Sequence, residues 1–158
     1  EQFRTAYNEK DIVFLENIFS EDALIITGTV TTVRKTDGMG ISYNKVTYKK
    51  QNKQQYIRNL KRSFASNSWI NVRFEDVKVV KHPNPQMEGF YGVTVRQKYS
   101  NSRGYSDDGY LFLLWDFRDE DNVQIHVRTW QPYWMDENRT QPISKEDVFT
   151  PGDFVIHL

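Results

Sequence analysis

Apolar residues in the first part of the chain recur at helical spacing. Residues 3–7 have the pattern of the end of a helix, and Asp11 can cap a second short helix with apolar residues at 12, 15, 18 and 19. The clearest helix follows Asn52, because Gln55 three residues later completes a capping box. Its apolar side chains are Tyr56, Ile57, Leu60 and Phe64. The sequence therefore predicts three helices before residue 68.

Beyond residue 69 the apolar positions alternate with a period of two, which is typical of β-strands. Strands are predicted at 70–79, 91–99, 109–117 and 123–134. The alternation slips by one residue at Glu75 and Asp76, which indicates a β-bulge. Residues 23–26 predict an earlier strand, and residues 27–48 a twisted hairpin or long loop. Helices followed by an antiparallel meander predict an α+β domain with the helices on one face of the sheet.

The register of the last hairpin decides which of its side chains face the core. If Phe117 pairs with Val123 across the turn, then Trp115 lies opposite Ile125. The same register places Leu113 opposite Val127 and Leu111 opposite Thr129. The other face then carries Phe112, Leu114, His126, Arg128 and Trp130. Large apolar groups are unusual on a solvent face, so we expect these five residues to form the interface of a homodimer.

Composition narrows the classes of function. The 158 residues fit one domain, and aromatic residues at 15% compensate for an apolar fraction of 38%. With 21 basic and 21 acidic side chains, the chain lacks the basic excess that nucleic-acid binding needs. It has no cysteine and no run of 18 apolar residues. We therefore predict no disulfide, no nucleic-acid partner and no membrane span.

The histidines offer no metal-ligand spacing. His82 lies in a Pro-rich turn, His126 in a strand and His157 near the end of the sequence. Neither a metal nor another cofactor is therefore predicted. His126 can instead reach Asp116 diagonally across the hairpin, either as a cross-strand ion pair or as a pH-sensitive or catalytic pair.

The order of elements resembles the nuclear transport factor 2-like (NTF2-like, or cystatin-like) superfamily. The residues that carry this resemblance are 6–23, 109–118 and 125–130, and the likeness extends over residues 3–134. It implies a cone-shaped α+β fold in which N-terminal helices pack on a curved antiparallel sheet. Members include ketosteroid isomerase, scytalone dehydratase, polyketide cyclases and transport adaptors, so the fold alone does not assign an activity. The late strands are most similar to a branch of exported bacterial proteins, which implies the periplasm or cell envelope.

The functional positions of the isomerase do not carry its chemistry in this chain. The resemblance places its tyrosine at Phe3, its base at Thr27 and its second acid near Leu113. None of these side chains can perform the corresponding step, because none is a carboxylate or an acidic hydroxyl. No catalytic residue is therefore predicted, although Tyr7, one helical turn after Phe3, could substitute as a donor.

A cone of helices over a curved sheet can remain open at its mouth. The predicted ligand-binding residues are Tyr7, Tyr56, Gln97, Leu113 and Trp115, and the alternative is a filled core without a cavity. The leading interpretation is a noncatalytic domain of an exported bacterial protein that binds a small apolar ligand or another protein. The alternatives are an isomerase, dehydratase or cyclase acting in the cone, and a purely structural dimerisation module.

The two ends of the sequence lie outside this pattern. Residues 135–158 are expected to form a C-terminal arm or the start of a further region, which leaves residues 1–134 as the domain. The sequence begins at Glu1 and not at Met, so we expect any signal peptide to have been removed.

Overall fold

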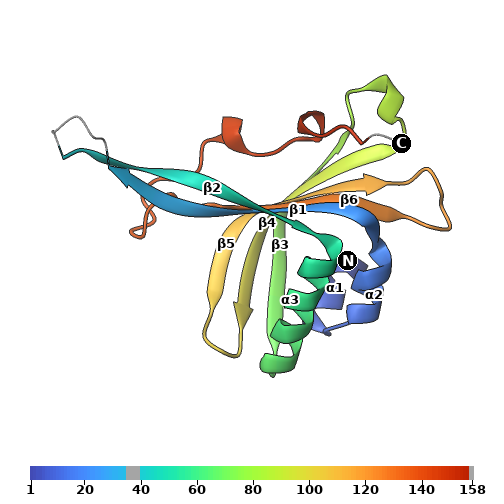
Figure 1. Ribbon diagram of the computed structural model, residues 1–158, viewed down its shortest axis with the longest axis horizontal. Helices are drawn as coiled ribbons and strands as arrows, with labels where there is room; N and C mark the ends of the chain where they lie inside the picture. The colour runs from blue at the N-terminus through green and yellow to red at the C-terminus, as the bar shows by residue number, and fades with distance from the viewer. Residues whose placement is uncertain (35–39, 157–158) are drawn as a thin grey trace.

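A computed structural model describes residues 1–34 and 40–156 of the chain. It contains three α-helices, six strands and three short 3₁₀ turns in these residues. The helices cover one side of the sheet and the C-terminal segment crosses the other (Figure 1). His157 lies outside the described residues. The α+β architecture with N-terminal helices is as the sequence predicts.

The three helices begin where the sequence places their caps. Helix α1 spans Gln2–Asn8, α2 spans Ile12–Ile18 and α3 spans Lys53–Ser66. The Asp11 carboxylate accepts a hydrogen bond from the backbone N–H of Phe14 at 3.1 Å. Asn52 and Gln55 form the predicted capping box, which fixes the start of α3.

The six strands form one sheet in the order β2-β1-β6-β5-β4-β3. Their bounds are Phe19–Arg34 (β1), Ser42–Asn52 (β2), Ile70–Lys81 (β3), Phe90–Asn101 (β4), Ser106–Asp116 (β5) and Gln124–Pro132 (β6). All neighbours are antiparallel except β1 and β6, which run parallel. The predicted meander therefore covers β3 to β6, and the long β1–β2 hairpin extends it at the other edge.

Two predicted details of the strands are corrected by the structure. The first strand begins at Phe19 and not at residue 23, so Phe19, which the helical spacing assigned to the second helix, and Asp22 both lie within β1. The β5–β6 pairing also contains an irregularity between Leu114 and Trp115. By contrast, the predicted bulge in β3 is confirmed, because its pairing with β4 shifts between Glu75 and Lys78.

The core is divided between the two faces of the sheet. The larger cluster lies under the helices and includes Phe3, Leu15 and Phe19. The smaller cluster lies on the opposite face. Its members are Met87, Phe90, Phe112, Leu114 and Val127, with Leu24, Phe149, Phe154 and Ile156 packed against them. The segment predicted as an arm thus buries apolar side chains of the sheet.

Candidate functional site

A cavity of about 580 Å³ lies on the helix-covered face of the sheet. Its size is within the range of pockets that hold small ligands, roughly 300 to 1,000 Å³. Residues from α1, α3 and five of the strands line it. They include Tyr7, Thr27, Tyr56, Leu60, Val72, Gln97, Tyr99, Asp107, Arg128 and Trp130. The cone is therefore open and not filled by core side chains.

A pair of tyrosines forms one wall of the cavity. The hydroxyl groups of Tyr7 in α1 and Tyr56 in α3 hydrogen-bond to each other. Burial raises the pKa of both hydroxyls, that of Tyr7 well above its usual range. The tyrosines are thus neutral hydrogen-bonding groups at physiological pH.

Arg128 in β6 stands next to these tyrosines. Its guanidinium carbon lies 4.9 Å from the centroid of the Tyr56 ring, and the group also interacts with the Tyr7 hydroxyl. A cation over an aromatic ring is a favourable contact when both are removed from water. Arginine keeps its charge at any relevant pH. The cavity therefore contains a permanent positive charge.

Arg128 and Trp130 lie on the opposite face of the sheet from the one predicted from the sequence. Trp115 does pair with Ile125 as predicted, but Leu114 then pairs with Val127 and Leu113 with Arg128. The extra residue in β6 at this point is a β-bulge, and one inserted residue exchanges the two faces of every later position. Arg128 and Trp130 therefore face the cavity instead of a partner subunit.

Asp107 in β5 is the only carboxylate among the described residues that line the cavity. Burial raises its pKa to about 6, although Tyr105 and Arg128 oppose this shift. One of its carboxylate oxygens is buried without a hydrogen-bond partner in the described residues. Asp107 lies opposite Tyr99 on β4, so the two side chains share the cavity face of the sheet. Nothing in the sequence distinguished Asp107 from an acidic residue exposed to solvent in a turn.

The indole of Trp130 lies against Gly109 on the neighbouring strand. A methyl group at position 109 would come within 2.5 Å of the Trp130 ring, so only glycine allows this close approach. The Trp130 Nε1–H is buried and has no hydrogen-bond partner in the described residues. The ring thus supplies both an apolar wall and an unused donor.

The structure brings together three of the five predicted ligand-binding residues. Tyr7, Tyr56 and Gln97 line the cavity. Leu113 and Trp115 belong to the hydrophobic core next to it, where Trp115 is only partly buried and its ring centroid lies 6.1 Å from that of Phe3. They support the cavity wall without forming it.

The predicted dimer face is covered by the chain itself. Phe112 and Leu114 are buried, with exposed fractions of 1% and 0%. The ring of Phe154 stacks on Phe112 with centroids 5.6 Å apart. The interface prediction for these two residues is therefore wrong in this arrangement, because the C-terminal segment occupies their surface.

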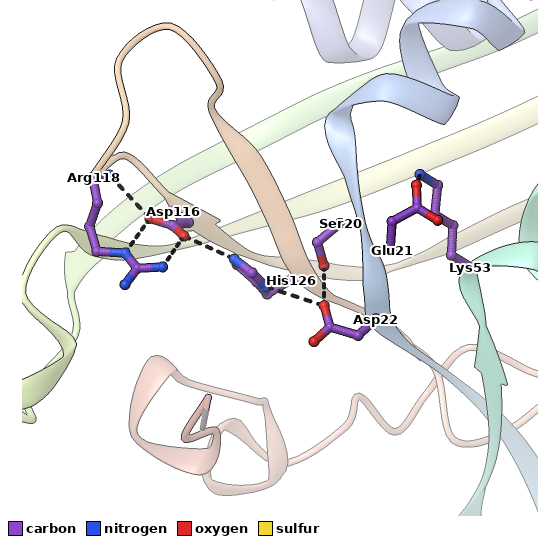
Figure 2. A network of polar contacts seen from close by, with 7 residues as sticks. All are labelled: Ser20, Glu21, Asp22, Lys53, Asp116, Arg118 and His126. Atoms are coloured by element: carbon purple, nitrogen blue, oxygen red, sulfur yellow. Dashed lines mark hydrogen bonds and ion pairs between the residues drawn. The ribbon is translucent and has the colours of Figure 1, made fainter. Parts of the chain in front are cut away.

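His126 and Asp116 form the predicted pair on this second face (Figure 2). The Asp116 carboxylate accepts hydrogen bonds from Arg118 at 2.7 and 2.9 Å and lies 3.0 Å from His126 Nε2. Burial would raise the pKa of Asp116, but the hydrogen bonds from Arg118 and His126 outweigh it and lower the pKa to about 2. The Arg118 guanidinium and the His126 ring both contact the ring of Phe90, which belongs to the smaller core cluster. Asp116 thus lies outside the cavity.

The polar groups of Figure 2 form a chain across strand β6 and onto β1. His126 Nδ1 lies 4.0 Å from Asp22, and Ser20 donates a hydrogen bond to that carboxylate at 3.0 Å. Glu21, the residue between them, points to the other side and pairs with Lys53 of α3 at 2.9 Å. No group of three or more metal-binding side chains occurs in the described ranges. We interpret this network as a structural link between strands.

A family model described as the Cds6 C-terminal NTF2-like domain matches residues 41–129. The chain belongs to this family. The match includes β2, α3 and strands β3 to β5, together with most of β6, so it contains most of the cavity-lining residues. The NTF2-like fold inferred from the sequence is thereby confirmed. No helix in the described part of this NTF2-like domain is long and apolar enough to cross a membrane.

Solved structures share the fold at low sequence identity. Bd1075 of Bdellovibrio bacteriovorus is 16% identical, with a TM-score of 0.60 over 84% of this chain. The chain spans only 37% of that protein's length. A chain of naphthalene 1,2-dioxygenase is 8% identical, with a TM-score of 0.64 over 89% of this chain and 78% of its own. An NTF2-like protein of unknown function from Pseudomonas putida is 9% identical, with a TM-score of 0.57, and the coverage is 93% and 88%. No protein of curated function matches the sequence.

The inherited isomerase positions can now be located in the NTF2-like domain. Thr27 lines the cavity, whereas Phe3 and Leu113 are buried in the core. None of the three offers an ionisable group. Any chemistry in this cavity would therefore depend on Asp107, Arg128 and the tyrosine pair, which lie elsewhere in the sequence.

Proposed function

We propose that this chain is a noncatalytic small-ligand-binding domain of an exported bacterial protein. The observation that carries the proposal is a cavity whose walls combine apolar surface with buried polar atoms that have no hydrogen-bond partner among the described residues. Small-molecule sites typically have this composition, with a few polar groups that orient the ligand between hydrophobic walls. The assignment to the periplasm or cell envelope is part of the proposal and rests on the resemblance to exported proteins.

The arrangement of the polar groups favours binding over catalysis. Proton abstraction needs a base in hydrogen-bond reach of the substrate and a separate donor for the developing negative charge. Tyr7 and Tyr56 satisfy each other, and Arg128 contacts both. Asp107 interacts with Arg128 and Tyr105, and neither Tyr7 nor Tyr56 is among the groups that shift its pKa.

A fragment screen tests the binding function directly. We expect small aromatic and aliphatic molecules to bind, as detected by ligand-observed NMR. The Leu60→Trp variant places a large ring on the α3 wall of the cavity and should abolish this binding. The Asn59→Trp variant is the matched control, because Asn59 is an exposed neighbour in the same helix and does not line the cavity. Equal binding by both variants, or no binding by the wild type, would contradict the proposal.

A second candidate function is proton transfer by an enzyme. The raised pKa of Asp107, about 6, favours this candidate, since perturbed carboxyl groups in clefts are common at active sites. The test is incubation with ketones and carboxylic esters in D₂O, followed by NMR detection of deuterium at the carbon next to the carbonyl. Exchange that is lost in Asp107→Asn would support the enzyme and replace the noncatalytic proposal.

The homodimer stays a prediction, and a purely structural dimerisation module remains an alternative to ligand binding. Phe112 and Leu114 are available to a partner only if the C-terminal segment leaves the sheet. Light scattering at micromolar concentration should give about twice 18.8 kDa if a dimer forms through another surface. A monomer would remove the dimerisation module and leave ligand binding and the enzyme as the two candidates.

A further inference from the structure

In the described part of the chain, three of the buried polar atoms without a hydrogen-bond partner belong to residues that line the cavity. They are Asp107 Oδ1, Arg128 Nε and Trp130 Nε1. Buried polar groups in folded proteins nearly always have a partner, because an unpaired group costs its full desolvation energy. Two donors and one acceptor in the same cavity therefore indicate the place of a polar ligand group.

Arg128 determines the charge that this group should have. None of the ion pairs formed by the described residues, which extend to 4.0 Å, includes Arg128. The contacts of Arg128 include the ring of Tyr56 and the hydroxyl of Tyr7, both of which remain neutral because burial raises their pKa. The Arg128 Nε–H is buried and has no hydrogen-bond partner in the described residues. Asp107 interacts with Arg128 but forms no ion pair with it within 4.0 Å, so a bound anionic group would supply the missing partner.

The two unused donors lie on the same strand and the same face. Arg128 and Trp130 are separated by one residue of β6, which places their Cα atoms roughly 6 to 7 Å apart. A carboxylate can accept hydrogen bonds at both oxygens, and its charge strengthens both bonds. Much of the remaining surface is apolar and offers room for a hydrocarbon or aromatic body, although Ser63, Gln97 and Asn101 also line it. The apolar side chains include Leu60, Phe64, Ile70 and Val72.

We infer that the ligand is a small monocarboxylate whose carboxylate group binds Arg128 and Trp130 and whose apolar body fills the cavity. This inference rests on the proposed function, because it names the chemistry of the ligand at the same site. A purely apolar pocket would bind a neutral ligand more tightly than a charged one, whereas this cavity should bind the carboxylate more tightly.

Asp107 makes this binding depend on pH. Its neutral form can donate a hydrogen bond to a carboxylate, whereas its ionised form repels one and competes for the charge of Arg128. Its pKa of about 6 places the change in the accessible range. The titratable and charged groups around it are Tyr99 on β4, Tyr105 and Asp108 beside it, Arg128 on β6, and Arg73, Lys98 and Arg139 on its outer side. Asp108 is neutralised by Arg96 at 2.8 Å, so Asp107 is the acid whose charge changes.

The test compares acids with their neutral amides. The probes are 3-phenylpropanoate, 2-naphthylacetate and octanoate, each beside its primary amide, titrated into ¹⁵N-labelled protein at pH 5.5. The reporter is the indole N–H signal of Trp130, assigned with the Trp130→Phe variant. We expect at least one acid to bind about tenfold more tightly than its amide and to shift this signal. We also expect its binding to weaken at pH 8.

Two variants separate the charge effect from general damage to the fold. Arg128→Gln should remove the preference for acids, and Asp107→Asn should remove the dependence on pH. Arg103→Gln is the control, because Arg103 is exposed in the β4–β5 turn and should leave both unchanged. If Arg128→Gln does not fold, the relative affinities of each acid and its amide for the wild type still test whether the site prefers a carboxylate.

The outcomes distinguish the inference from the proposed function. Amides that bind as tightly as the acids would overturn the inference and leave the binding function intact. Acids that bind without shifting the Trp130 signal would also overturn it, because they would occupy another site. If neither acids nor amides bind, the inference fails, and a negative fragment screen would then remove the proposed function as well.

Discussion

The attachment of the C-terminal segment to the sheet depends on one buried side chain. Gln131 in β6 is fully buried, and its amide group donates to Tyr48 Oη at 3.0 Å and to the carbonyl of Asp147 at 2.7 Å. Its carbonyl oxygen accepts from the backbone N–H of Phe149 at 3.1 Å. We expect Gln131→Leu, which keeps a similar volume but removes all three bonds, to loosen this segment.

The magnitude follows from the number of bonds and the access of water. Three hydrogen bonds at about 0.5 to 1.5 kcal/mol each give a loss of roughly 1.5 to 4.5 kcal/mol. The lower half of this range applies, because Asp147 is exposed and its carbonyl can bond to water after the change. We therefore expect the free energy of unfolding to fall by about 2 kcal/mol.

Urea denaturation measures this loss, and limited proteolysis reports whether residues 145–156 become accessible. The control is Gln124→Leu in the same strand, where the described hydrogen bonds include none to the Gln124 side chain; it should change stability by less than about 0.5 kcal/mol. A loss below about 0.5 kcal/mol in Gln131→Leu, with unchanged resistance to protease, would refute the claim that this glutamine holds the segment.

The carboxyl groups and the glycine in β5 give three further predictions. Asp116→Asn should lower the free energy of unfolding at pH 7 by about 2 kcal/mol, because the pKa of Asp116 is lowered to about 2 in the folded state. In the wild type this stabilisation is fully present above about pH 4 and is lost as the pH falls from 4 to 2. Acid unfolding followed by circular dichroism measures the loss. Asp107→Asn should have the opposite effect and increase the free energy of unfolding at pH 7 by roughly 1 to 3 kcal/mol. The pKa of Asp107 is raised in the folded state, so the wild type loses stability as the pH increases from about 4 to 6. An unchanged or lower thermal midpoint of the variant would contradict this. Gly109→Ala should cost about 1 to 3 kcal/mol and displace Trp130, which a shift in tryptophan fluorescence would detect.

The overall fold was accessible from the sequence because its signals are local. The cap residues Asp11 and Asn52 and the change of period after residue 69 fix the helices and most of the strands. The parallel pairing of β1 with β6 was missed, because it joins segments about 100 residues apart and does not alter the spacing of apolar residues in either segment. The β3 bulge was visible only because apolar residues continue on both sides of it.

The site was predicted less completely, and one inserted residue explains most of the difference. The bulge in β6 faces the part of β5 around Leu114 and Trp115, where both faces of the strand carry apolar side chains. The alternation of apolar and polar residues is therefore not interrupted there, and the sequence does not reveal the bulge. The bulge moves Arg128 and Trp130 from the expected interface into the cavity. The environment of Asp107 also depends on tertiary burial, which its neighbours in the sequence do not indicate.

A crystal structure of the protein soaked with 3-phenylpropanoate at pH 5.5 tests the central claim most directly. We predict density for the ligand in the cavity between α3 and the sheet, with a carboxylate oxygen within hydrogen-bond distance of Arg128 Nε and the phenyl ring toward Val72. A cavity closed by the side chains of Arg128 and Trp130, or the ligand bound at another surface with the cavity empty, would contradict the account.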